Sequence, residues 1–389
     1  MAFVLKAVRR TALALGGWVA MKAATSVVIA TRLVALAVST LLPSSALGAQ
    51  ARGGACAATG TSMTPTAWVA PNARARTPSA GSTPLALVAD VPLPDPAKRF
   101  DYQSFDSTTG RLYISHMRGD RLVVFDTRAQ KLVASNEGFP GATGVWAVPE
   151  LHRVYVSVTG RHEVAVVDDR TLAVVAHVGD IRFPDGIAFA PAEQKVFVSD
   201  ESGEADVVIE ARSNTKAERI ALGGEAGNTH YDAVSHCIVV AVQTKNELAA
   251  IDPASERIVA RYPIACDHPH GFLIDEPNRL AFVTCQGDAK LLVVDLRTMR
   301  TTATLRTADD PDVLALDPVL GRLYVGCEGG AVSVFEERFS GQQASLAPFG
   351  EYRAPHAHSV SVDPATHRVY VPLQDVNGKP TLRILEARP

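Results

Sequence analysis

Short runs of alternating apolar and polar residues, separated by turns rich in Gly, Pro and Asp, recur throughout residues 85–389. In one unit an apolar run at 313–316 meets a turn and continues into an alternating run at 322–326, which is the pattern of a β-hairpin. A third run follows at 331–335, and other units show a fourth, as at 131–135. The pattern predicts units of four antiparallel strands.

These units have a nearly constant length. The intervals between equivalent positions of their second strands are 42, 42, 42, 43, 42 and 46 residues. The positions are Tyr113, Tyr155, Phe197, Val239, Phe282, Tyr324 and Tyr370. An interval of about 42 residues is the length of one four-stranded propeller blade. Seven copies predict an all-β fold, a seven-bladed β-propeller of four-stranded antiparallel blades.

The seventh unit shows only three strands, near residues 359–362, 368–371 and 381–385. Residues 85–91, ahead of the first unit, have the composition of a strand. We expect this N-terminal strand to complete the last blade and close the ring, because closure removes the open sheet edges that favour aggregation.

The second strands carry closely similar motifs. They are Arg111-Leu112-Tyr113-Ile114-Ser115, Arg153-Val154-Tyr155-Val156-Ser157, Lys195-Val196-Phe197-Val198-Ser199 and Arg368-Val369-Tyr370-Val371-Pro372. Third strands end in Val124-Phe125-Asp126 and Val166-Val167-Asp168. With these motifs the chain resembles the YVTN-repeat, YncE-like seven-bladed propellers over about residues 85–389. The resemblance implies the fold and leaves the function open, because such propellers serve as scaffolds, binding proteins and enzymes.

The N-terminal region has the features of a targeting segment. Residues 1–48 combine basic residues and an apolar run with no acidic residue, which is typical of a secretory signal peptide. Lys22 and Arg32 interrupt the apolar stretch, so a permanent transmembrane anchor is not expected. Residues 49–84, rich in Ala, Gly, Ser, Thr and Pro, predict a flexible leader. We therefore expect a periplasmic or secreted propeller formed by residues 85–389.

The charge of the propeller restricts its partners. Residues 85–389 hold 30 basic and 41 acidic side chains, a net charge of −11. Such a balance repels phosphate backbones and favours cationic ligands, so nucleic-acid binding is not expected. The chain also lacks a Gly-rich phosphate loop, a Gly-x-Ser-x-Gly elbow, a Cys-x-x-Cys-His haem motif and a His-Glu-x-x-His helix.

In a propeller the inner strand of each blade begins, and the second strand ends, on the same face, so residues at these two points surround one mouth of the central channel. Aligning the blades places one polar set at the first point: Asp101, Thr143, Asp185, His230, His270, Asp312 and His358. A second set falls at the other point: Glu201, Gln243, Gln286, Glu328 and Gln374. The alignment of His230 requires a first hairpin about three residues shorter than its neighbours.

Three kinds of site fit these residue types. Imidazole and carboxylate ligate divalent metal ions, and His230, His270, Asp185 and Glu201 are our candidate metal ligands. The same residues could act without a metal, with a histidine of near-neutral pKa as general base and a carboxylate that orients it. Alternatively, they only hydrate the opening. No cofactor follows from the sequence beyond one candidate divalent ion.

Cysteines lie near the same predicted face. Because an exported protein meets an oxidising environment, a disulfide between Cys266 and Cys285 is a candidate, with Cys327 as a competing partner of Cys285. If these thiols stay reduced, Cys285 and Cys327 beside His270 predict a soft site for copper or zinc, or simply buried thiols.

Three functions remain. The leading hypothesis is an exported propeller that binds a small polar ligand, a metal ion or a partner loop at the mouth. The alternative is a metal-assisted hydrolase, lactonase or lyase that uses the same mouth. A third is a scaffold for an envelope protein, in which a long loop expected at residues 336–355 contacts the partner.

Overall fold

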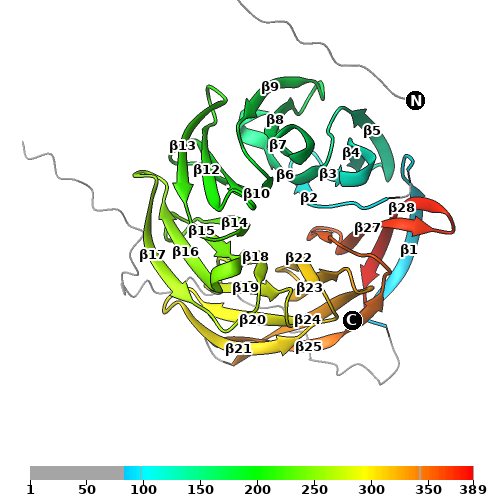
Figure 1. The fold of residues 1–389 in the computed structure, drawn as a ribbon. Helices are drawn as coiled ribbons and strands as arrows, with labels where there is room; N and C mark the ends of the chain where they lie inside the picture. Colours follow the sequence, from blue (N-terminus) through cyan, green and yellow to red (C-terminus); the bar gives the residue numbers. More distant parts are fainter. Residues whose placement is uncertain (1–82, 97, 341–342, 389) are drawn as a thin grey trace, which may run out of the picture. The chain divides into compact units, whose positions relative to one another are not determined.

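A computed structural model describes residues 83–389 except 97, 341–342 and 389. Within these residues, 28 strands form seven sheets of four antiparallel strands each. The inner strands of successive sheets contact one another around the whole circuit, from β2 to β26 and back to β2. Figure 1 shows the seven sheets arranged as blades around a central opening. The predicted seven-bladed β-propeller is confirmed.

Six blades follow the chain from the inner to the outer strand. They are β2–β5 (Gln103–Asp106, Arg111–His116, Arg121–Asp126, Lys131–Glu137), β6–β9 (Ala142–Val148, Arg153–Val158, Glu163–Asp168, Val174–Gly179), β10–β13 (Pro184–Ala190, Lys195–Asp200, Ala205–Glu210, Thr215–Ala221), β14–β17 (Ala226–Asp232, Cys237–Val242, Glu247–Asp252, Arg257–Pro263), β18–β21 (Pro269–Asp275, Leu280–Cys285, Lys290–Asp295, Arg300–Arg306) and β22–β25 (Pro311–Asp317, Arg322–Cys327, Ala331–Ser340, Gln343–Arg353).

The seventh blade combines both ends of the propeller. Its strands β26 (Ser361–Asp363), β27 (Arg368–Val376) and β28 (Lys379–Ala387) are completed by β1 (Leu85–Pro92). β1 pairs with β28 in antiparallel register, from Leu85 opposite Ala387 to Pro92 opposite Thr381. The N-terminal strand therefore closes the ring, as predicted.

Hydrophobic contacts between neighbouring blades form the core. The aromatic residues of the sequence repeat lie on the second strands and are buried with less than 2% of their surface exposed: Tyr113, Tyr155, Phe197, Phe282, Tyr324 and Tyr370. One cluster joins Tyr324 of the sixth blade to Val369 of the seventh and Leu85 of β1. The repeated aromatic residue thus holds adjacent blades together by burying apolar surface.

The prediction of a long loop at residues 336–355 is wrong. β24 and β25 extend into a hairpin in which Glu337 pairs with Leu346 and Phe339 with Ala344. The longer interval of 46 residues arises because β24 and β25 have 10 and 11 residues, against 6 and 7 for the equivalent strands of the fifth blade. Backbone pairing satisfies the extra peptide groups.

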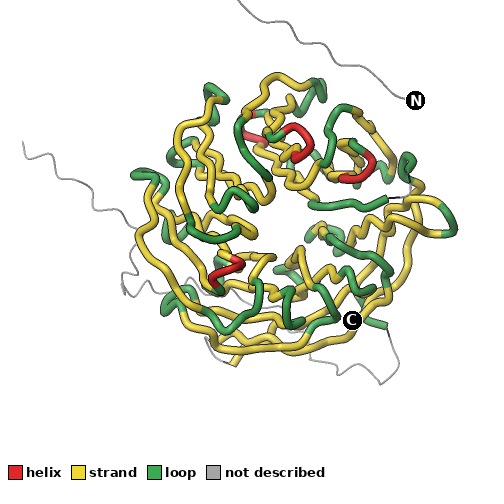
Figure 2. The backbone as a smooth tube through the Cα atoms, in the orientation of Figure 1, coloured by secondary structure: helices red, strands yellow, loops and turns green. Residues whose placement is uncertain are grey.

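Helix is confined to four single turns of 3₁₀-helix in the described part of the chain, namely η1 (Met117–Gly119), η2 (Pro149–Leu151), η3 (Thr159–Arg161) and η4 (Gln243–Lys245), drawn in red in Figure 2. No helix among the described residues has the length and apolar character needed to cross a membrane. The signal peptide predicted at 1–48 and nearly all of the leader predicted at 49–84 lie outside the described residues.

Candidate functional site

A β-bulge at the start of the inner strands sets the direction of the mouth residues. In β6, β10, β14, β18 and β22 the pairing register shifts between the first and the fourth residue, for example between Pro269 and Phe272 in β18. A bulge redirects a side chain that would otherwise follow the regular alternation of the strand. The second residue of each strand, such as Asp185, His270 and Asp312, lies in the bulge.

Glycine follows the mouth residue where blades approach most closely. A Cβ atom on Gly271 would lie 1.8 Å from the carbonyl oxygen of Asp312, and one on Gly144 would lie 1.8 Å from that of Asp185. Only glycine leaves room for this contact. This close contact brings the mouth residue of one blade beside the mouth residue of the next.

The second predicted set is fixed by backbone hydrogen bonds across the same hairpins. Glu201, Gln243, Gln286 and Glu328 are the first residues after β11, β15, β19 and β23. The backbone N–H of Gln286 donates to the carbonyl of His268 at 3.0 Å, and that of Glu328 donates to Asp310 at 2.9 Å. Each residue is thereby held close to the start of its inner strand.

These residues surround a cavity of about 240 Å³ at the channel mouth. Its lining consists of Arg99, Asp101, Tyr102, Thr143, Phe183, Asp185, Glu201, His270, Gln286, Asp310, Asp312, Glu328 and His358. Eight of the ten predicted ligand-binding residues are among them. Gln243 lies behind this layer, where its amide donates to Glu201 at 3.3 Å and to the carbonyl of Ala226 at 3.1 Å.

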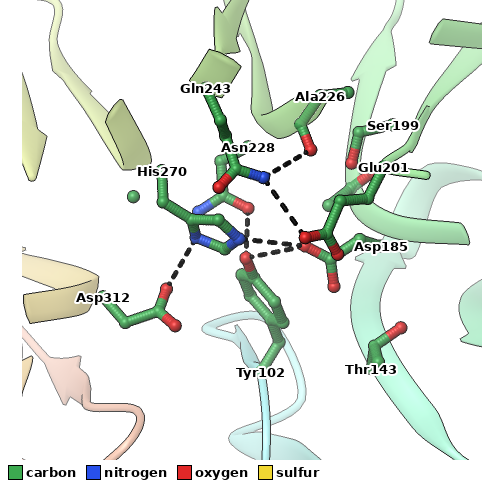
Figure 3. A network of polar contacts seen from close by, with 12 residues as sticks. Tyr102, Thr143, Asp185, Ser199, Glu201, Ala226, Asn228, Gln243, His270 and Asp312 are labelled. Carbon is green, nitrogen blue, oxygen red and sulfur yellow. Dashed lines mark hydrogen bonds and ion pairs between the residues drawn. The ribbon is translucent and has the colours of Figure 1, made fainter. Parts of the chain in front are cut away.

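Asp312 connects the two histidines of the cavity. Its Oδ1 lies 3.0 Å from Nδ1 of His270, and its Oδ2 lies 3.3 Å from Nε2 of His358. The amide of Gln286 also donates to Oδ2 of Asp312, at 3.2 Å. Figure 3 shows His270 between Asp312 on one side and Asp185 on the other, with 3.7 Å from its Nε2 to Asp185 Oδ2.

His358 has a carboxylate at each ring nitrogen. Nε2 lies 2.8 Å from Asp101, and Nδ1 lies 2.6 Å from Glu328. Arg99 also pairs with Glu328, at 3.0 Å, and its Nη2 lies 3.1 Å from His358 Nδ1. A ring that donates to two carboxylates cannot also accept from Arg99, so Glu328 is the anion that two cations share.

Tyr102 and Asn228 cover the opposite side of Asp185. The Tyr102 hydroxyl lies 3.2 Å from Asp185 Oδ2 and 2.5 Å from Asn228 Oδ1. A hydroxyl has one proton to donate, so it satisfies only one of these acceptors at a time. Asp185 is therefore only partly compensated, by His270 at 3.7 Å and by a hydroxyl that it shares with Asn228.

The pKa values follow from this arrangement. Burial opposes a charge on His270, but Asp312, Asp185 and Glu201 outweigh it and raise the pKa to about 9. Burial likewise opposes a charge on His358, yet Asp312 and Asp101 raise its pKa well above the usual value. Burial would raise the pKa of Asp312, but the two histidines lower it strongly. Both imidazoles are therefore charged at neutral pH and are paired with carboxylates.

Two carboxyl groups show the opposite shift. Burial, followed by repulsion from Asp101, raises the pKa of Asp185 to about 7, although His270 partly offsets the rise. Burial also raises the pKa of Glu201. These groups lack a sufficient cation nearby.

His230 is not at the mouth. Gly227 occupies the second position of β14, and a Cβ atom on it would lie 3.0 Å from the backbone of His270. His230 lies three residues further along, opposite Val239, with its ring 5.9 Å from Trp146 and 5.7 Å from Phe272. The assumption of a shorter hairpin is wrong, because the fourth blade has the same inner-strand length and bulge as its neighbours.

The four candidate metal ligands are not all brought together. Among the described residues no group of three or more His, Cys, Asp or Glu side chains is arranged to hold a metal ion. His230 is removed from Asp185 and Glu201, and Asp312 and Asp185 hold a proton on His270 that a metal ion would have to displace. The general-base hypothesis meets the same difficulty, since the pKa of His270 is about 9 rather than near neutral.

Cys266 and Cys285 form a disulfide with 5.4 Å between their α-carbons. It joins the segment before β18 to the end of β19 and so fixes the hairpin that carries His270 and Gln286. Cys327 is a buried free thiol, and burial raises its pKa to about 12. The soft-metal hypothesis, which required reduced Cys285, does not fit this pairing.

Five residues of the site were not predicted: Arg99, Tyr102, Phe183, Asn228 and Asp310. Arg99 and Tyr102 belong to the connection between β1 and β2. Asp310 lies just before β22, and Asn228 lies one residue after the mouth position of β14. Alignment of blades could have found Asn228 only with the correct register.

Fold and cavity together define a β-propeller with a small, strongly charged pocket at one mouth. No protein-family model matches the chain, and no curated protein matches it. Among solved structures, hydrazine synthase of Kuenenia stuttgartiensis is similar, with a TM-score of 0.62 and 18% identity, covering 72% of this chain and 94% of that chain. The structure of U3-55K has a TM-score of 0.65 and 8% identity, covering 76% of this chain and 98% of that chain. At such identities the likeness shows the fold alone.

Proposed function

We propose that the protein is an exported propeller of the YVTN-repeat, YncE-like type that binds a small cationic organic ligand in the mouth cavity. The observation that carries this proposal is the charge of the lining. Six carboxyl groups face three basic groups, Arg99, His270 and His358. The carboxyl groups belong to Asp101, Asp185, Glu201, Asp310, Asp312 and Glu328.

The three bases do not compensate all six acids. His270 and His358 share Asp312, and Arg99 and His358 share Glu328. Asp185 and Glu201 keep raised pKa values because burial penalises their charge. An ammonium or guanidinium group placed beside them would supply the missing charge and the hydrogen-bond donors.

The family and the export rest on separate observations. The YVTN-like motifs form the second strands, where their aromatic residues are buried between blades. The Cys266–Cys285 disulfide is typical of proteins in oxidising compartments, which supports export to the periplasm or beyond. The net charge of −11 for residues 85–389, from 30 basic and 41 acidic side chains, favours cations over nucleic acid.

Titration calorimetry of the full chain with hexylamine, hexanol and hexanoate tests the proposal. Hexylamine should bind more tightly than the other two, and more tightly at about pH 8 than at about pH 6, because it binds the ionised form of Asp185. Asp185→Asn should weaken hexylamine binding and remove much of the pH dependence. Glu386→Gln, at an exposed position of β28, is the control for the loss of one negative charge. Equal binding of hexanol and hexylamine would contradict a cation site.

A further inference from the structure

A second cavity adjoins the mouth cavity and has the opposite charge. It has a volume of about 390 Å³ and is lined by Lys98, Arg99, Arg118, Glu328, His356 and Gln374. Arg99 and Glu328 line both cavities, so the two share a wall. We call the second one the outer cavity, because Lys98, Arg118 and His356 are exposed.

The basic residues of the outer cavity are held together by the backbone. The N–H of Arg118, in η1, donates to the carbonyl of Arg99 at 3.1 Å. This bond fixes η1 beside the connection that leads into the first blade, so Arg118 lies next to Lys98 and Arg99 although 18 residues or more separate them in the chain.

Lys98 and Arg118 differ from Arg99 because no carboxylate neutralises their positive charges. Arg99 pairs with Glu328 at 3.0 Å, and Glu328 also pairs with His358. Among the described residues that line the outer cavity, Glu328 alone carries a carboxyl group, and Arg99 and His358 already share it. Among the described residues no acidic side chain forms an ion pair with Lys98 or Arg118. The positive charges of Lys98 and Arg118 therefore remain available to a ligand in the outer cavity.

We propose that the ligand is zwitterionic: its cationic group enters the acidic mouth cavity, and a carboxylate or phosphate at its other end binds Lys98 and Arg118 in the outer cavity. This inference rests on the proposed function and adds the anionic end. Cavities of opposite charge that share a wall orient such a molecule in one direction only. They also discriminate against a simple amine, which leaves the rim charges unpaired, and against a simple acid, which meets the carboxylates of the mouth.

The matched probes are ε-aminocaproate, hexylamine and hexanoate, which share one carbon chain and differ only in their charged ends. Calorimetry with the full chain should show ε-aminocaproate binding about threefold to tenfold more tightly than hexylamine, the gain expected from partly exposed ion pairs. In the double variant Lys98→Gln, Arg118→Gln this advantage should disappear, while hexylamine should bind no more weakly than before. Both positions are exposed, and a thermal unfolding scan checks that the variant is folded.

A control variant separates a local effect from a change in net charge. Arg300→Gln removes one positive charge from an exposed position on the outer strand β21 and should keep the advantage of the zwitterion. Equal affinities of hexylamine and ε-aminocaproate in the unaltered protein would overturn the zwitterion proposal and leave the cation site intact. Failure of both probes to bind would instead contradict the proposed function itself.

Discussion

At the scale of single residues, Asp312 controls the charge state of the mouth. It is 2% exposed and lies 3.0 Å from one imidazole and 3.3 Å from the other. Neither His270 nor His358 would keep its proton so strongly without this carboxylate, because burial alone acts against a charged ring. The charge state of the site therefore depends on one buried carboxylate of the cavity lining.

Asp312→Asn should therefore lower the pKa of both histidines. For His270 we expect a fall from about 9 by roughly one unit or more, since a neighbouring opposite charge shifts a pKa by about that amount. NMR titration of the imidazole resonances measures the change directly. The exposed neighbour Asp309 provides the control variant Asp309→Asn, which should leave the His270 titration in place. An unaltered His270 titration in Asp312→Asn would show that Asp185 and Glu201 suffice to hold the charge.

The sequence indicated the positions of mouth residues where the repeat is regular. Asp185, His270 and Asp312 stand at the same point of similar strands, so alignment of the blades places them together. It failed for His230, because the sequence does not reveal that a glycine can occupy the mouth position of one blade. It also missed Tyr102, which stands one residue after the mouth position Asp101, as Asn228 stands one residue after Gly227, and Arg99, which precedes the mouth position.

At the scale of elements, the contact between neighbouring inner strands is the most sensitive feature of the site. Gly271→Ala would place a methyl group 1.8 Å from the Asp312 carbonyl oxygen, so β18 and β22 must separate. We expect a loss of about 1–3 kcal/mol in the free energy of unfolding, the usual cost of overpacking. Weaker ligand binding should accompany it, because Asp312 is displaced.

Chemical denaturation measures this loss, with Gly179→Ala as the matched control. Gly179 also lies in a strand, β9, but a Cβ atom there meets no other atom within 4 Å. The control should change the free energy of unfolding by no more than about 0.5 kcal/mol. Equal effects at the two glycines would mean that the close approach of β18 and β22 relaxes without cost.

A second contact joins the end of an inner strand to the residue before the second strand of the next blade. Between the fifth and sixth blades this contact differs in charge from two equivalent contacts. Between the fourth and fifth blades Asp232 pairs with Arg279 at 2.5 Å, and between the sixth and seventh Asp317 pairs with His367 at 2.7 Å. Between the fifth and sixth blades the corresponding pair is Asp275 and Gly321, and the side chain that approaches Gly321 is Glu337. Two buried carboxyl groups, Asp275 and Glu337, meet here, whereas the other two contacts pair an acid with a base.

This contact should make stability depend on pH. Burial, followed by repulsion from Asp275, raises the pKa of Glu337 from 4.5 to about 8. The folded protein therefore holds the Glu337 proton more tightly than the unfolded chain does. The stability that this proton contributes is complete below about pH 4.5 and is lost as the pH rises through about 8. Glu337→Gln mimics the protonated form, so its advantage in melting temperature over the unaltered protein should grow between about pH 5 and about pH 8. The exposed Glu386→Gln serves as control; parallel pH profiles for the two variants would contradict the carboxyl pair.

At the scale of the whole molecule, the ring is closed by one strand from the far end of the chain. Apolar contacts join each blade to the next, and within the seventh blade β1 pairs with β28. Without β1, that blade would leave β28 as an open edge. The sequence revealed this closure, because the seventh unit lacks one strand and one unassigned strand precedes the first unit. The extra length of β24 and β25 was not revealed, because polar residues in a long hairpin resemble a loop.

Two leucines of β1 test how much the closure contributes to the stability of the whole propeller. Leu85 is 1% exposed and packs in the cluster with Tyr324 and Val369, whereas Leu87 on the same strand is 55% exposed. Leu85→Ala should lower the free energy of unfolding by about 2–5 kcal/mol, while Leu87→Ala should change it by no more than about 0.5 kcal/mol. If closure couples all blades, calorimetry of Leu85→Ala will show one transition shifted to lower temperature. A separate early transition, with the main one in place, would mean that the seventh blade unfolds on its own and that the other six do not need the closed ring.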